Sequence, residues 1–163
     1  MAVSRLIMHR MILTLSLLVL VIVPAGAELT LADRVVAFVD ETAITLSEFN
    51  RFHKTTPALT RNQAVRVMIN RLLLKKEALK LKLNGTDDEM IQQYIDLKIK
   101  SLVIIKNEDI ERFYKEHKDD LKGTEIEDVR ENIEKLLIEE EVNKRLDSSL
   151  QELTEKAYVR IQF

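Results

Sequence analysis

The chain has 163 residues, enough for one ordinary domain, and its 25 Lys and Arg against 27 Asp and Glu give a formal net charge of −2. This balance argues against a basic nucleic-acid-binding module, and the absence of Cys excludes disulfide frameworks, thiol catalysis and cysteine-ligated zinc. Three Gly and two Pro are too few for a turn-rich β fold. With 46% hydrophobic and 32% charged residues, the composition predicts a mainly α protein built from amphipathic helices.

Residues 1–27 have the layout of a secretory signal peptide. Two arginines precede a 13-residue apolar run at residues 11–23, which Pro24 ends before the small residues Ala-Gly-Ala. The alternative is an uncleaved membrane anchor, but 13 residues are short against the ~20 needed to span a bilayer. We therefore predict cleavage after Ala27 and export to the periplasm. The mature chain, 28–163, would form one domain with net charge −4 and no further membrane span.

The mature chain is expected to open with a short strand at residues 34–39, whose apolar side chains on both faces suit a strand covered on both sides. A turn at 40–42 and a brief return at 43–44 follow. Residues 45–48 (TLSE) form a capping-box pattern, in which the Thr hydroxyl accepts the third residue's N–H and the Glu reaches back. This box predicts a helix at 46–54.

Three further Thr-x-x-Glu/Gln boxes, beginning at Thr60, Thr86 and Thr124, each precede an apolar periodic run. The helices expected from these boxes and from apolar periodicity span residues 61–83, 87–106, 108–117 and 125–157. The last residues, 158–163, alternate polar and apolar side chains and predict a strand. We expect this strand to pair with the one at 34–39, because an unpaired apolar strand invites aggregation.

The two central helices carry apolar residues on more than one face, whereas a surface helix needs only one stripe. Either both helices lie centrally, with neighbours on two sides, or part of the apolar surface stays open as a groove. Core is the commoner use of each such residue taken singly. The residues that would line an open groove are Val67, Leu74, Leu81, Ile91, Ile95 and Leu102.

The long C-terminal helix changes phase. Its apolar residues between 126 and 137 share one stripe, and those between 142 and 157 share another, about half a turn away. We expect the two halves to pack against different surfaces, or the helix to kink near the acidic run at 139–141. The second half is expected to lie against the N-terminal strand and the first short helix.

Charge is divided unevenly, with net +3 over residues 28–106 and net −7 over residues 107–163. The favoured interpretation is an intramolecular match between the basic first long helix and the acidic C-terminal half. Nucleic acid is not an expected partner, because phosphate binding would need a larger positive excess and interleaved aromatic residues.

The sequence offers no recognisable catalytic constellation. His53 and His117 are far apart and neither belongs to a metal-type pair, no Ser sits on a Gly-flanked elbow, and no Gly-rich loop could hold a phosphate. We therefore expect a protein that is not an enzyme and that uses neither a metal nor a cofactor. A carboxylate-based enzyme stays as a rival, although no pair of carboxylates stands out.

Four segments resemble the SurA-type periplasmic chaperones in their order and spacing. They are residues 33–49 (DRVVAFVDETAITLSEF), 68–79 (MINRLLLKKEAL), 104–117 (IIKNEDIERFYKEH) and the closing helix and strand at 126–163. In that family, one or two parvulin prolyl isomerase domains usually lie before the closing helix. Here only residues 118–123 intervene, so the resemblance implies the chaperone core without isomerase activity.

The resemblance implies an ATP-independent holdase that binds unfolded or nascent outer-membrane and secreted proteins through an apolar cradle. The six groove residues named above are the candidates for that cradle. The alternative is a secreted interaction or assembly module that binds one dedicated partner through the long C-terminal helix. A homodimer is compatible with either function.

Overall fold

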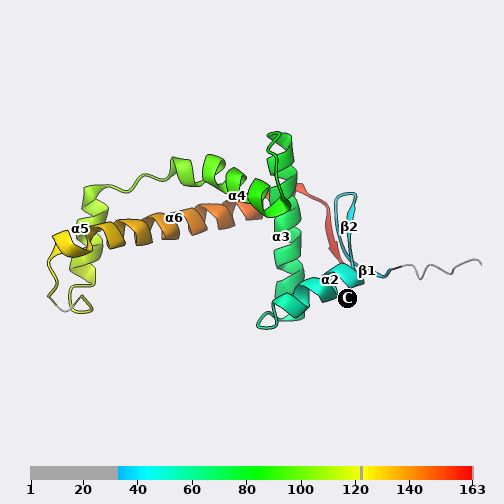
Figure 1. The fold of residues 1–163 in the computed structure, drawn as a ribbon, viewed down its shortest axis with the longest axis horizontal. Helices are drawn as coiled ribbons and strands as arrows, with labels where there is room; N and C mark the ends of the chain where they lie inside the picture. Colours follow the sequence, from blue (N-terminus) through cyan, green and yellow to red (C-terminus); the bar gives the residue numbers. More distant parts are fainter. Residues whose placement is uncertain (1–32, 122, 163) are drawn as a thin grey trace, which may run out of the picture. The chain divides into compact units, whose positions relative to one another are not determined.

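The computed structural model describes residues 33–121 and 123–162, so the predicted signal peptide and cleavage site lie outside the described residues. Within this part the protein is mainly helical with one small antiparallel sheet, which confirms the predicted fold class (Figure 1). In chain order the elements are β1 (Val35–Val39), β2 (Thr42–Thr45), α2 (Leu46–Thr55), α3 (Arg61–Lys80), α4 (Asp87–Lys98), the 3-10 turn η1 (Lys100–Leu102), α5 (Asn107–Glu116), α6 (Ile126–Lys156) and β3 (Val159–Ile161). None of the described helices has the length and apolar character needed to cross a membrane.

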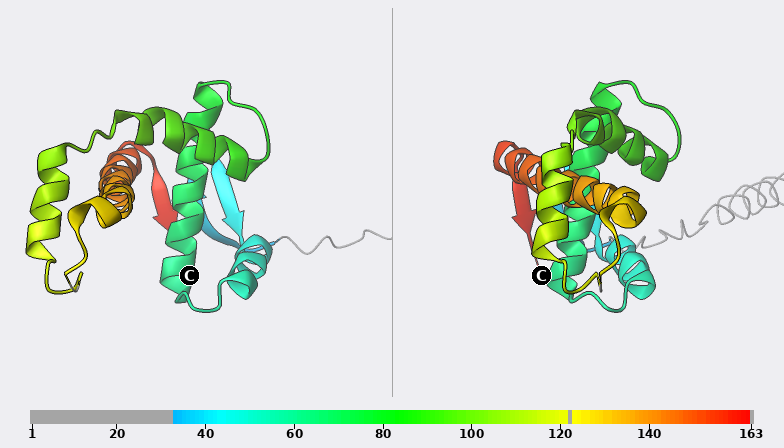
Figure 2. Two further views of the ribbon diagram at one scale, coloured as in Figure 1. Left: turned by 60° about the vertical axis from the view of Figure 1, so that its left-hand side comes forward. Right: turned by 90° about the vertical axis from the view of Figure 1, so that its left-hand side faces the viewer.

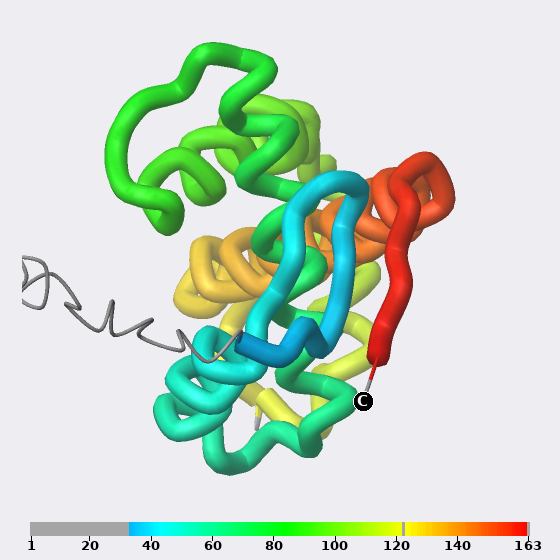
Figure 3. Tube along the Cα trace, turned by 90° about the vertical axis from the view of Figure 1, so that its right-hand side faces the viewer, coloured from blue at the N-terminus to red at the C-terminus, as the bar shows by residue number. Residues whose placement is uncertain are grey.

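The sheet brings the two ends of the described chain together. Its strand order is β2-β1-β3, and β3 runs antiparallel to β1 with Ala37 opposite Ile161 and Val39 opposite Val159 (Figure 3). The predicted pairing of the first and last strands is therefore confirmed. Ala37 and Val39 are buried and belong to a core cluster with residues of α3, while β2 returns from β1 through a tight turn at Asp40.

Three of the four predicted capping boxes form. At the start of α2 the Thr45 hydroxyl accepts the N–H of Glu48 at 3.3 Å, and the Glu48 carboxylate accepts the N–H of Thr45 at 2.9 Å. Equivalent reciprocal bonds begin α3 at Thr60 and α4 at Thr86. Local sequence therefore fixes where these helices start.

The fourth box, at Thr124, is wrong. α6 begins one residue later than that box requires, with Glu125 as its N-cap and no side-chain cap. Thr124 thus lies outside the helix, too early in the chain to cap it. Its carbonyl instead accepts the Tyr114 hydroxyl at 2.7 Å, which ties the segment before α6 to α5.

Both central helices end earlier than predicted. α3 stops at Lys80 because Lys82 takes a left-handed conformation (φ 57°), and Leu83 then donates its N–H to the Ala78 carbonyl in a Schellman-type end. The single helix predicted for 87–106 is also wrong. α4 ends at Lys98, where Ile99 leaves helical geometry and is buried, and a 3-10 turn and an extended segment follow.

The core consists of two clusters on two sides of α3. The first contains the inner face of the sheet, Phe49 of α2, and the α3 residues Val65, Ile69 and Leu73. The second contains Leu74 and Ala78 of α3 together with Met90, Ile91 and Tyr94 of α4. Leu153 of α6 packs against both clusters. The expectation that α3 has neighbours on two sides is confirmed.

α6 packs against two surfaces, as its change of phase predicts. Its first half lies against α5, where Ile110 and Ile133 are both buried. Its second half lies against α3 and the second cluster through Leu146 and Leu150, so the N-terminal strand and first short helix named in the prediction are not its main partners. Only Leu153 and Ala157, at the end of this half, pack against the first cluster, to which those two elements contribute. Figure 2 (left) shows α6 between α5 and α3. The helix is continuous through the acidic run at 139–141.

Candidate binding grooves

The structure does not bring the six predicted groove residues together. Leu74 and Ile91 are 5% and 9% exposed and belong to the second core cluster. The more exposed members, Val67, Leu81 and Leu102, lie on α3, just after α3, and on η1. Leu102 is separated from the others because α4 ends before it, so helical phase no longer places it on the face of Ile91.

The sixth residue, Ile95, does line a groove, which lies between α4 with η1 and the middle of α6. This α4–α6 groove has a volume of about 500 Å³, within the range of roughly 300–1,000 Å³ typical of ligand clefts. Its apolar lining consists of three half-buried side chains, Ile95 of α4 and Ile138 and Val142 of α6. Its polar and charged lining is Gln92, Asp96, Lys100, Lys135, Glu139 and Asn143.

The position of the α4–α6 groove follows from the change of phase in α6. Before the acidic run, the apolar stripe of α6 turns toward α5. After it, the stripe turns toward α3 and α4. Ile138 lies at this changeover and belongs to neither stripe, so periodicity alone gave it no role. The acidic run beside it was the sequence signal that marked the place.

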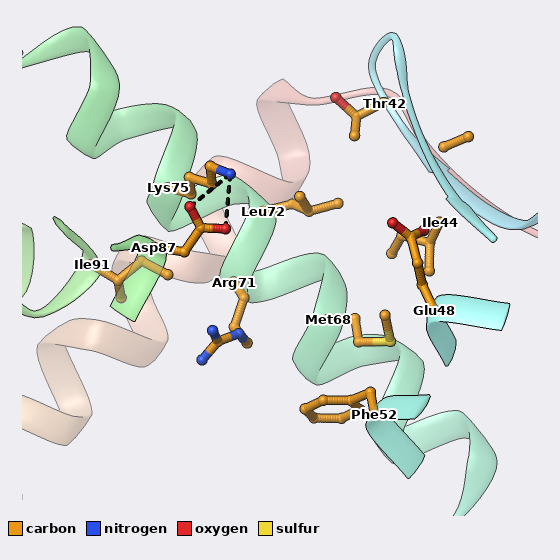
Figure 4. A pocket seen from close by; sticks show the side chains of 11 residues that line it. Thr42, Ile44, Glu48, Phe52, Met68, Arg71, Leu72, Lys75, Asp87 and Ile91 are labelled. Carbon is orange, nitrogen blue, oxygen red and sulfur yellow. Dashed lines mark hydrogen bonds and ion pairs between the residues drawn. The ribbon is translucent and has the colours of Figure 1, made fainter. Parts of the chain in front are cut away.

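A second, smaller groove of about 190 Å³ lies between β2 with α2 on one side and α3 with the start of α4 on the other (Figure 4). The view shows Phe52 and Met68 close together, with Ile44 and Leu72 farther along the same space. Ile91 also lines this β2–α3 groove, so it combines a core position with a place at the groove wall.

Ion pairs between α3 and α4 border the β2–α3 groove. Lys75 Nζ lies 2.8 Å from Asp87, and Arg71 pairs with Asp88, where the first turn of α4 faces α3. Four α3 cations, Arg71, Lys75, Lys76 and Lys80, pair with Asp88, Asp87, Asp40 and Glu77 rather than with acids of the C-terminal half, so the predicted charge match with that half is not seen at these residues. The acids at the α4 N-terminus and Asp40 stand closer to the α3 cations and neutralise them instead.

The rims of both grooves carry fixed charges of both signs. At the α4–α6 groove, Lys135 pairs with Glu131 at 2.6 Å, and this hydrogen bond raises the pKa of the Lys135 ammonium. Beside the β2–α3 groove, hydrogen bonds from Thr86 lower the pKa of the Glu89 carboxyl. These groups therefore keep their charge near neutral pH, and neither groove presents a single sign of charge.

The two histidines of the described chain lie apart and against aromatic rings. His53 stacks on Phe49 with ring centroids 5.5 Å apart, and His117 stacks on Phe113 at 4.0 Å. Nδ1 of His117 is 2.9 Å from the Phe113 carbonyl. Across the described residues, no group of three or more His, Asp or Glu side chains is arranged to hold a metal ion.

No model of a known protein family matches the chain, and no curated protein matches it. The resemblance to SurA-type chaperones therefore stays a prediction that rests on the sequence segments alone.

Proposed function

We propose that the protein is an ATP-independent periplasmic chaperone of the holdase type, which binds unfolded outer-membrane or secreted polypeptides. The observation that carries this proposal is the α4–α6 groove, where Ile95, Ile138 and Val142 present an apolar surface between two helices. The signal-like N-terminus and the SurA-like order of segments support the compartment and the class of client.

An unfolded barrel protein offers chemistry that suits this groove. Strands of outer-membrane barrels alternate apolar and polar side chains, so an extended segment can place apolar groups on the groove floor and polar groups toward the rim. The rim supplies Lys100 and Lys135 beside Asp96 and Glu139. Because both signs are present, the groove does not select clients by net charge, which suits a broad client range.

The energetics favour weak and reversible binding. Covering one aliphatic side chain contributes roughly 1.5–3 kcal/mol, and the loss of translational and rotational freedom opposes this by at least about 4 kcal/mol. Covering the three apolar groove side chains together with about as many side chains of the client leaves an affinity near the micromolar level, on the order of −8 kcal/mol. The client is then released when its own folding competes with binding, and no nucleotide is required.

The test is the aggregation of a urea-unfolded outer-membrane barrel protein on dilution, followed by light scattering. We expect the purified protein to slow aggregation without ATP. The double variant Ile138→Ser with Val142→Ser should protect markedly less, because it removes most of the apolar floor. The matched control is Leu136→Ser, since Leu136 lies on the same helix, is exposed, and lines neither groove. Circular dichroism should show that all variants keep their helices.

Two outcomes would contradict the proposal. Full protection by the double variant would place client binding on another surface. No protection by the wild type at several-fold excess would reject the holdase, and one stoichiometric partner captured through α6 would then favour the interaction module.

A further inference from the structure

The outer edge of β3 is unpaired in the described part of the chain. β3 is an end strand of the sheet, and no described strand lies beyond it in Figure 3. Toward β1, the Tyr158 carbonyl accepts the N–H of Asp40 at 2.8 Å, and the N–H of Gln162 donates to the Val36 carbonyl at 2.7 Å. Residues 158, 160 and 162 therefore direct their backbone groups toward β1.

Backbone groups alternate in direction along an antiparallel strand, so those of Val159 and Ile161 point away from β1. The backbone N–H and carbonyl groups of these two residues make no hydrogen bond to other backbone groups within residues 33–121 and 123–162. The edge thus offers two N–H donors and two carbonyl acceptors in the spacing of a β ladder. Only another extended chain matches this pattern of donors and acceptors.

Exposed apolar side chains flank these backbone groups on both faces of the sheet. Tyr158 is 61% exposed and Ile161 is 43% exposed. Val159, on the same face as Ile161, packs against the first core cluster. A strand added beside β3 would cover Ile161 and extend the apolar face of the sheet.

The opposite edge of the sheet is less accessible to a new strand. In β2 the N–H of Thr45 already donates to the Glu48 carboxylate at 2.9 Å, and α2 begins at the next residue. The open edge is therefore a property of β3 rather than of the sheet in general.

We propose that β3 binds an extended segment of the client by strand addition, so that the backbone of the client joins the sheet. This inference rests on the proposed holdase function and adds a second site, separate from the α4–α6 groove, at which the client backbone is held in an extended form. The preferred segment alternates apolar and polar residues, places its apolar side chains on the face of Val159 and Ile161, and carries an acidic residue opposite Arg160.

Arg160 decides between a client strand and a second copy of this chain. A symmetric antiparallel pairing of two β3 strands through all four outward groups would place each Val159 opposite an Ile161. It would also set the two Arg160 side chains directly opposite each other, and like charges in that position are destabilising. An acidic residue in the added strand turns the same position into a favourable pair.

The test uses the full mature chain and a fluorescent peptide of alternating Val and Thr with one central Glu. Ile161→Pro removes one outward N–H and leaves the bonds of Tyr158 and Gln162 to β1 in place. We expect it to bind the peptide roughly tenfold more weakly. Ile161→Thr is the matched control, because it keeps the N–H and a β-branched side chain. It should bind within a few-fold of the wild type.

Charge reversal gives an independent readout. Arg160→Glu should bind the Glu peptide more weakly and should prefer a peptide with Lys at the central position. A structural defect would weaken both peptides alike. Hydrogen exchange should show new protection at the amides of Val159 and Ile161 when the Glu peptide is bound to the wild type.

A peptide N-methylated on the residues that face β3 keeps the test decisive if Ile161→Pro fails to fold. Equal binding of methylated and unmethylated peptides by the wild type would overturn strand addition. A concentration-dependent dimer that Ile161→Pro abolishes would instead make a second copy the occupant. If the protein still protects a client from aggregation when either of these results is obtained, strand addition is rejected but the holdase function is retained. The two proposals can therefore be rejected independently.

Discussion

Asp40 holds three parts of the chain at one point. It lies in the left-handed region (φ 51°) at the turn between β1 and β2. Its N–H donates to the Tyr158 carbonyl, its Oδ1 accepts the N–H of Tyr158 at 2.9 Å, and its carboxylate pairs with Lys76 of α3. The hairpin, the start of β3 and the central helix therefore meet at a single carboxylate.

The ionisation of Asp40 should contribute to stability at neutral pH. The hydrogen bond from Lys76, followed by that from the Tyr158 backbone, lowers the pKa of Asp40 below its ordinary value of 3.8. Its stabilising effect is therefore present above that value and is lost as the pH falls through the lower, folded-state pKa. Asp40→Asn should lower the melting temperature at pH 7 and make little difference near pH 2, as followed by circular dichroism.

The control for this pH dependence is Asp147→Asn, because the Asp147 side chain is exposed and makes no hydrogen bond or ion pair with the described residues. If Asp40→Asn lowers the melting temperature equally at pH 7 and near pH 2, then the hydrogen-bond geometry of Asp40, rather than its charge, accounts for its contribution to stability.

Single residues also show how far sequence predicts the candidate site. The same periodicity selected Leu74, Ile91 and Ile95, yet the first belongs to the core and only the last two reach a groove. Periodicity shows which apolar residues share one face of a helix. It does not show how closely the neighbouring helix packs against that face. Ile138 and Val142 line the α4–α6 groove together with Ile95, and tertiary packing decides which residues of two helices meet at such a groove.

At the scale of elements, the local sequence patterns predicted where helices start better than where they end. The boxes at Thr45, Thr60 and Thr86 act within one turn, so their effect can be read from four residues. α4 ends where Ile99 leaves helical geometry and is buried, and burial is set by tertiary packing that a short sequence pattern does not show. The helix predicted for 87–106 was too long for this reason.

Thr60 caps a helix and Thr124 does not, so substitutions at these two residues form a matched pair. Thr60→Ala should lower the free energy of unfolding by about 1 kcal/mol, because it removes a hydroxyl that caps α3. Thr124→Ala should change stability much less, since α6 has no side-chain cap and starts after Glu125. Urea denaturation of both variants measures the difference. Equal losses would mean that Thr124 caps α6 in solution after all.

Across the whole molecule, the C-terminal segment completes the domain. β3 covers one side of β1, and Leu153 and Ala157 at the end of α6 pack against the first cluster. The sequence predicted this closure because β1 is apolar on both faces and the last residues alternate. The division of α6 between α5 and α3 was also predictable from its phase, whereas the grooves between these parts were not.

Removal of residues 158–163 should therefore destabilise the whole domain rather than its end alone. The deletion exposes the β1 edge and removes the backbone bonds of Tyr158 and Gln162. We expect a lower melting temperature with one cooperative transition and faster hydrogen exchange in β1 and α3. A deletion variant that melts like the full chain would contradict a structural role for β3.

The pairing of β1 with β3 also sets an order of assembly. The Asp40–Tyr158 contact joins residues 118 positions apart, so it closes a long loop at a high entropic cost, whereas the β1–β2 hairpin closes locally. One side of β1 therefore stays open until residues 158–162 have been synthesised, so the β1–β2 hairpin can form early whereas the complete sheet forms late.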